Sequence, residues 1–310
     1  MPYLRAFGCY LPSEVVTNAE LAPRVAADPA WLEHVTGIQE RRFAAPNQSV
    51  ADLAVFAARD CLQSGGMNAR EIGFVVVASG TAERRFPGPA ASIAAALGIP
   101  GVPAIDLPMA SAGSLFGICL AADLTPRYGN VLVIGAEIMS RVLRIDAAGR
   151  DTAVLFGDGA GACVVSPDAG FAQIKDSLLA SDGDFGEALQ LYWDAPLYMD
   201  GRTVILHAAR KLPRAINELL ERNGCKPAAV DTYLLHQANL NLITRVAHAL
   251  HVPEERFFQN LCRYGNTSSA SLLIAAAEWR RSATPNTGSP IILAAFGAGF
   301  HWGAMLAYTC

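Results

Sequence analysis

Two hydrophobic patterns alternate along the chain. Short β-branched runs are typical of buried strands, and longer stretches with helical spacing predict helices. The strand-like runs cover residues 72–78, 103–107, 131–134, 230–235 and 291–295. The helix-like stretches cover residues 50–64, 92–97, 111 to about 124, 240–250 and 271–279. Glycines follow two of these helices, at Gly65 and Gly98, as expected of helix ends.

The pattern repeats after about 160 residues, since 72–78 corresponds to 230–235 and 131–134 to 291–295. Because strands alternate with helices, each copy should be a mainly parallel sheet covered by helices. Two copies would bury helices between two sheets. We therefore predict an α/β protein of two βαβ-type halves, residues 1–165 and 166–310.

Composition narrows the class of protein. The chain has 310 residues, of which 52% are apolar and 17% charged, enough for a large core. The net charge of −4 and pI near 5.9 give no electrostatic case for binding nucleic acid or an anionic membrane. The densest basic spots, Glu40-Arg41-Arg42 and Glu83-Arg84-Arg85, are short enough to be solvated surface.

The seven cysteines include no C-x-x-C pair, which favours reduced, buried thiols in a cytoplasmic protein. No apolar run reaches 18 residues and the first residues lack a hydrophobic signal, so we expect neither a membrane span nor a signal peptide. The histidines have no metal-ligand spacing, so we expect no metal site.

His236 and Asn266 are the first candidates for chemistry. His236 ends the strand-like run 232–235, and Asn266 follows Gly265 just ahead of the helix 271–279. Uncharged hydrogen-bonding side chains at strand and loop ends suit the stabilisation of an oxyanion or enolate. The structural alternatives are an ordinary hydrogen-bonded histidine and a capping or turn asparagine.

Ser111 lies where a strand gives way to a helix, and a helix N-terminus favours developing negative charge. The alternative is a plain N-cap serine. A hydrolase elbow of the G-x-S-x-G type is excluded because Met109 stands two residues earlier. The duplication places Ser111, His236 and Asn266 where they can converge on one site.

Two glycine-rich stretches need separate interpretations. Residues 157–162 loosely fit a dinucleotide-binding motif, but a strand follows them instead of a helix, so tight packing or a turn is favoured. Residues 296–303 are a strand followed by a glycine-rich loop. Their N–H groups could form an oxyanion hole, with a plain turn as the alternative.

Several motifs occur together in one order: Trp31, Thr36-Gly37-Ile38-Gln39-Glu40-Arg41, Phe156 to Ala162, His236-Gln237-Ala238-Asn239, Gly265-Asn266-Thr267-Ser268 and Phe296 to Gly303. Together they resemble the 3-oxoacyl-(acyl-carrier-protein) synthase III family of the thiolase fold. The resemblance implies a layered α-β-α-β-α sandwich, a homodimer and an acyltransferase of class 2.3.1. Such enzymes acylate a cysteine from acyl-CoA and condense the acyl group with a malonyl-carrier thioester as CO2 leaves.

Roles follow by resemblance. His236 and Asn266 would assist decarboxylation, and the backbone N–H groups of Ser111 and Ala298 would form the oxyanion hole. Phe86 would close the partner's acyl pocket.

Acyl-CoA is expected as a substrate, with no resident cofactor. Trp31, Arg150 and Arg245 would bind CoA or the carrier protein. Val35 and Asn241 stand where the family commonly has arginines, which weakens the expectation of a carrier partner.

Ser111 departs from the family, because it occupies the position of the nucleophilic cysteine. A serine hydroxyl needs a nearby base, and His236 is the only obvious one. Ser111 is an O-acylated nucleophile, or the site works without an acyl-enzyme, or serine is an engineered replacement.

We therefore predict transfer of a short acyl group from acyl-CoA to Ser111 and on to a carrier-bound malonyl acceptor, in fatty acid or polyketide biosynthesis. The alternatives are acyl transfer without condensation and a non-catalytic partner of an active synthase.

Overall fold

A nine-stranded sheet, in the order β11-β12-β13-β8-β1-β7-β6-β4-β5, is the frame of the protein. The computed structural model describes all residues, 1–310. The strands of the sheet are β1 (Tyr3–Tyr10), β4 (Ile72–Ala78), β5 (Ala104–Leu107), β6 (Asn130–Glu137), β7 (Gly159–Ser166), β8 (Ala172–Ser181), β11 (Thr232–Leu235), β12 (Pro290–Gly297) and β13 (His301–Thr309). Two small hairpins lie outside it, β2 (Glu14–Thr17) with β3 (Glu40–Phe43) and β9 (Leu189–Gln190) with β10 (Tyr198–Met199).

Ten α-helices accompany the strands. They are α1 (Asn18–Leu21), α2 (Pro29–Thr36), α3 (Val50–Ser64), α4 (Ala90–Ala96), α5 (Gly113–Tyr128), α6 (Arg150–Ala153), α7 (Gly201–Arg222), α8 (Leu240–Leu250), α9 (Leu261–Tyr264) and α10 (Ser271–Ser282). None of them is long and apolar enough to cross a membrane.

The sheet contains the same pairing order twice. β4 runs parallel to β6, β6 antiparallel to β7 and β7 antiparallel to β1; likewise β11 is parallel to β12, β12 antiparallel to β13 and β13 antiparallel to β8. Within the sheet, the two copies are joined where Tyr3 and Leu4 of β1 pair with β8. The duplication is confirmed. The division at residues 165 and 166 stays a prediction.

The expectation of mainly parallel sheets is wrong, because each copy is mixed. In the second copy the reason is plain: β12 and β13 are separated by three residues, and a connection that short joins only antiparallel neighbours.

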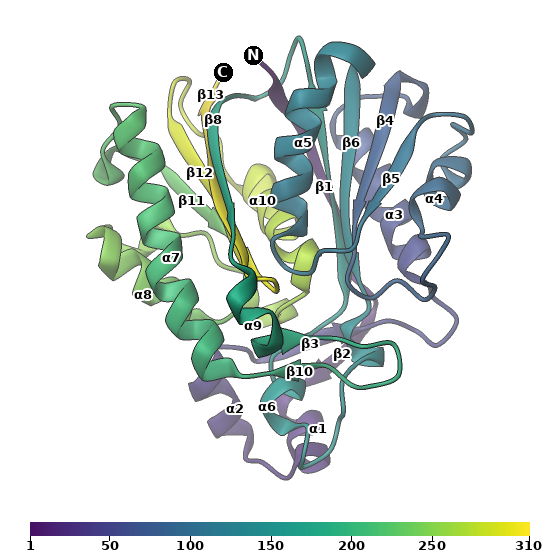
Figure 1. Cartoon of the computed structure of the whole chain (residues 1–310), viewed down its shortest axis with the longest axis vertical. Coiled ribbons are helices and arrows are strands. Elements are labelled where there is room, and N and C mark those ends of the chain that lie inside the picture. The colour runs from purple at the N-terminus through teal and green to yellow at the C-terminus, as the bar shows by residue number, and fades with distance from the viewer.

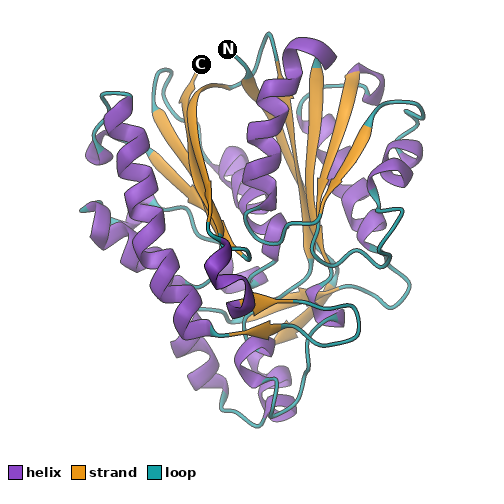
Figure 2. Ribbon diagram, viewed as in Figure 1, coloured by secondary structure: helices purple, strands orange, loops and turns teal.

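Helices form three layers with the sheet copies between them (Figure 1; Figure 2). α5 and α10 lie in the centre, α3 and α4 cover the outer face of the first copy, and α7 and α8 cover the second. Glycines in the strands allow the central helices to pack closely against the sheet. A Cβ on Gly161 of β7 would lie 2.5 Å from Leu273 Cβ, so this stretch serves packing and not dinucleotide binding.

Two expectations about side chains need correction. Arg41 is fully buried and not part of a solvated surface, because its guanidinium donates to Asn18 Oδ1 at 2.8 Å and to the Val154 carbonyl at 3.0 Å. The cysteines are all free, but only three are buried, and Cys262 and Cys310 are exposed.

Candidate active site

Ser111, His236 and Asn266 line one cavity of about 570 Å³. Ser111 lies between β5 and α5, His236 directly follows β11, and Asn266 lies between α9 and α10. Each of the three is only 6% exposed. The structure therefore brings together the three residues that the duplication predicted to converge.

Ser111 has an uncommon backbone conformation. Its φ is +56°, in the left-handed region that non-glycine residues seldom adopt. The helix α5 begins only at Gly113 and its N-cap is Ala112, so Ser111 is not an N-cap. A Cβ on Gly297 would lie 2.8 Å from Ser111 Cβ, so the end of β12 can pass this turn only as glycine. Such conformations concentrate at functional sites.

The hydrogen bonds of His236 indicate which ring nitrogen carries the proton. Nδ1 lies 2.5 Å from Ser271 Oγ, which also accepts the Gln237 N–H at 3.1 Å. In the tautomer whose Nδ1 accepts the Ser271 hydroxyl hydrogen, Nε2–H is a free donor, and this is the tautomer in which the hydroxyl both accepts and donates. Burial lowers the pKa of His236 to about 4, so the ring is neutral at pH 7.

Asn266 is oriented in a similar way. Its Oδ1 accepts the Ser268 N–H at 2.8 Å, and its own backbone bonds to Leu155 and Gly157. The amide Nδ2 makes no bond within the chain and remains free to donate. His236 and Asn266 thus both offer neutral N–H donors, the arrangement that stabilises an enolate oxygen.

A smaller cavity of about 170 Å³ also reaches Ser111, and Ala298 and Ser268 line it. The two expected oxyanion donors differ in availability. Ala298 N–H makes no hydrogen bond within the chain, whereas Ser111 N–H donates to Ser268 Oγ at 3.0 Å. The sequence indicates no role for Ser268 or Ser271, because a serine ahead of a helix cannot be distinguished from a helix cap.

Trp31 and Arg150 meet at the cavity that Ser111 lines. Trp31 is part of the lining and 37% exposed, and the Arg150 Cζ lies 5.0 Å from the centroid of its ring. Arg245 is exposed on α8 and is not part of the lining. Val35 lines the cavity, and its carbonyl accepts from Asn239 and Asn241.

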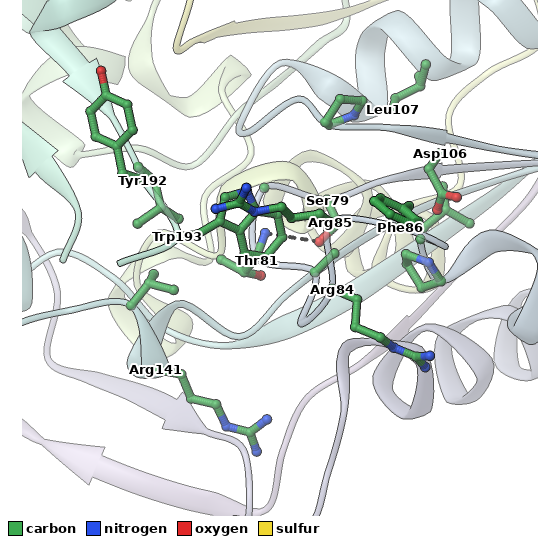
Figure 3. A pocket seen from close by; sticks show the side chains of 18 of the residues that line it. Ser79, Thr81, Arg84, Arg85, Phe86, Asp106, Leu107, Arg141, Tyr192 and Trp193 are labelled. Carbon is green, nitrogen blue, oxygen red and sulfur yellow. Dashed lines mark hydrogen bonds between the residues drawn. The ribbon is translucent and has the colours of Figure 1, made fainter. Parts of the chain in front are cut away.

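The largest cavity, about 1070 Å³, does not include Ser111. It contains Phe86, which is 85% exposed and lies beside Asp106 toward one end, with Tyr192 toward the other (Figure 3). It shares Gly80, Thr81, Pro108 and Leu191 with the smaller Ser111 cavity. The structure of one chain thus does not bring Phe86 to Ser111.

A duplicated, layered α/β fold with Ser111, His236 and Asn266 around one cavity is the arrangement expected of thiolase-like acyltransferases. Models of two parts of one family match the chain: 3-oxoacyl-[acyl-carrier-protein (ACP)] synthase III over residues 105–183, and its C-terminal part over residues 220–309.

Individual proteins give the same result. The β-ketoacyl-[acyl-carrier-protein] synthase III of Nitratidesulfovibrio vulgaris is 38% identical over 98% of this chain and 97% of its own. The crystal structure of 3-oxoacyl-[acyl-carrier-protein] synthase III from Aquifex aeolicus superposes with a TM-score of 0.95 at 34% identity, covering 99% of this chain and 100% of the other. The priming β-ketosynthase of the R1128 polyketide pathway superposes at 0.91 with 32% identity, covering 100% of this chain and 96% of the other.

The chain belongs to the 3-oxoacyl-[acyl-carrier-protein] synthase III family and is an acyltransferase of that type.

Proposed function

We propose that the protein condenses an acyl group from acyl-CoA with a malonyl group on an acyl carrier protein, with Ser111 in the position of the family's nucleophilic cysteine. The observation that carries this proposal is the single cavity shared by Ser111, His236, Asn266 and Trp31. The names of the relatives support it, since one is a β-ketoacyl-[acyl-carrier-protein] synthase III and another is the priming β-ketosynthase of a polyketide biosynthetic pathway.

In the first step, Ser111 Oγ bonds to the thioester carbonyl carbon and the carbon–sulfur bond of acyl-CoA breaks. This step needs the second tautomer of His236, in which Nδ1–H donates to Ser271 Oγ. Nε2 then takes the Ser111 hydroxyl proton and gives it to the departing CoA sulfur. The N–H groups of Ser111 and Ala298 bind the carbonyl oxygen, and the Trp31–Arg150 pair holds the nucleotide end of CoA.

In the second step, the malonyl thioester loses CO2 and the electron pair of the broken bond forms an enolate. His236 Nε2–H and Asn266 Nδ2 donate to its oxygen. The enolate carbon attacks the acyl carbonyl carbon, the bond to Ser111 Oγ breaks, and Oγ recovers a proton from solvent. The tautomer favoured at rest suits this second step.

We also propose a cytoplasmic homodimer. Three exposed aromatic side chains surround the largest cavity: Phe86, Tyr192 and Trp193 at 85%, 62% and 56% exposure. Contiguous exposed apolar side chains mark interaction sites, whereas single scattered ones do not, so we infer that a second copy covers this patch.

Intact-protein mass spectrometry with a panel of acyl-CoAs tests the nucleophile. The expected result is a mass gain in the parent and in Ser111→Cys that is absent in Ser111→Ala. A mass gain in Ser111→Cys alone would mean that the protein is a synthase of the cysteine-dependent kind in which serine has replaced the nucleophile and abolished acylation. No gain in any form would favour the non-catalytic partner.

Replacing His236 by Ala tests the second step. Release of CO2 from a malonyl thioester should fall by about 10²–10³-fold, the effect of removing one oxyanion donor. Asn266→Ala should act in the same direction. Unchanged CO2 release in both variants would refute the assignment.

A further inference from the structure

Ser268 already accepts a hydrogen bond from the Ser111 N–H, which the proposed reaction requires as an oxyanion donor. Its Oγ accepts the Ser111 N–H at 3.0 Å, which is the distance at which an oxyanion would bind. Ser268 lines the small cavity together with Ser111 and Ala298. A thioester oxygen entering this cavity would therefore meet a donor that already has an acceptor.

The Ser268 hydroxyl also contacts the buried carboxyl group of Glu137. Ser268 Oγ lies 3.1 Å from Oε1 of Glu137, a residue with no solvent exposure. Glu137 also accepts from Gly80 N–H, Thr81 Oγ1 and Ser269 Oγ, and no cation contacts it. Ser268 Oγ therefore lies between the Glu137 carboxyl and the Ser111 N–H, and the N–H can only donate to it.

The backbone of Ser268 is held separately from its hydroxyl. Its φ is +50°, and its N–H donates to Asn266 Oδ1 at 2.8 Å. Removing the hydroxyl therefore leaves the contact that orients Asn266 in place. This separation allows the two halves of the reaction to be tested independently.

We propose that Ser268 is a positioning residue that caps the Ser111 N–H in the resting site and gives it up to the acyl oxygen when the substrate enters. The inference rests on the proposed function, and it adds that the oxyanion hole is only half open without substrate. The cap holds the N–H in a satisfied, aimed position, but it competes with the thioester.

The test is the rate of acyl-enzyme formation from acyl-CoA. Samples are quenched at intervals and the intact protein mass is measured, both in the parent with Ser111 and in the Ser111→Cys variant. Ser268→Ala should raise the acylation rate by roughly threefold to tenfold, the range given by loss of one competing neutral hydrogen bond. Decarboxylation of a malonyl thioester should stay within about twofold, because it uses His236 and Asn266. Ser268→Gly, which also suits φ +50°, should behave in the same way if the alanine variant folds poorly.

Ser269→Ala is the matched control. Ser269 is equally buried and donates to the same Glu137 oxygen at 2.8 Å, but it does not contact Ser111 N–H. It should leave acylation unchanged. An equal rise in Ser269→Ala, or an unchanged or slower rate in folded Ser268→Ala and Ser268→Gly, would overturn the cap. Absence of acylation in the parent and in Ser111→Cys would overturn the proposed function itself, and the cap with it.

Discussion

At the scale of single residues, buried polar groups decide how this site works. His236, Glu137 and Arg41 have little or no exposure, and none of them forms a salt bridge, so burial is the first cause of the pKa shift of each. Burial therefore acts first: it lowers the pKa of His236 and raises that of Glu137. Hydrogen-bond partners then fix which atoms donate and which accept.

The depressed pKa of His236 predicts a pH dependence of stability. Between pH 4 and 6.5 the unfolded chain binds a proton at this residue and the folded chain does not, so the unfolding free energy rises with pH. The contribution is at most about 1.4 kcal/mol per pH unit. Urea unfolding of the parent and His236→Gln at several pH values measures it as the difference in slope. Parallel curves through this window would show that the folded pKa is not depressed.

Arg41→Met should lower the unfolding free energy by about 2–4 kcal/mol, because it leaves buried acceptors on Asn18 and Val154 without a donor. Arg42→Met is the control. Arg42 is partly exposed and contacts only Glu40, at 3.6 Å, among the acidic side chains. Its loss should change stability by about 1 kcal/mol or less. Equal effects of the two changes would refute the role given to burial.

At the scale of elements, β7 and α10 pack closely against each other at Gly161. Asn266, Ser268 and Ser271 all precede or begin α10, so a displacement of this helix moves two of the positioning serines and the amide together. Gly135 faces the same segment, since a Cβ there would lie 2.3 Å from the Ser269 carbonyl oxygen. Small residues in two strands therefore allow the segment that carries Asn266, Ser268 and Ser271 to lie close against the sheet.

Gly161→Ala should separate β7 from α10. The added Cβ would lie 2.5 Å from Leu273 Cβ, which should reduce stability by about 1–3 kcal/mol and lower turnover. In Gly183→Ala the new Cβ meets nothing within 4 Å, so that change should be neutral. Thermal unfolding and CO2 release of both variants provide the measurement. A neutral Gly161→Ala would mean that the helix can shift freely.

The elements that the sequence predicted well are those with local signals. α3 begins after a capping box formed by Ser49 and Asp52, and α8 after the N-cap Asn239, and both have the predicted bounds. α7, β8 and β13 were not predicted. α7 contains Pro213, which interrupts a helical pattern in sequence, although its buried residues Ala208, Leu212 and Ile216 recur at helical spacing. Likewise α5 continues past Pro126 to Tyr128, farther than its pattern predicted.

At the scale of the whole molecule, the site combines residues far apart in the chain. The repeat and the motifs were sufficient to place Ser111, His236 and Asn266 together. They were insufficient for Ser268 and Glu137, whose contact joins residues 131 positions apart and depends on tertiary packing alone. The same limit applies to Phe86, which in one chain lies away from Ser111. Its expected contribution to a neighbouring site depends on a second copy.

The proposed homodimer can be tested by measuring the mass of the protein in solution. Sedimentation velocity should give a mass near twice 32.8 kDa, and Phe86→Asp should weaken association by at least about tenfold, because a charge replaces a large apolar side chain in the patch. Leu206→Asp is the control, since Leu206 is 50% exposed on α7 and does not line the largest cavity. A parent that stays monomeric would refute the dimer. Equal weakening by both changes would place the interface elsewhere. A change in the preferred acyl length in Phe86→Asp would indicate that the largest cavity and the small Ser111 cavity are connected. Gly80 and Leu191, which line both cavities, are where they would join.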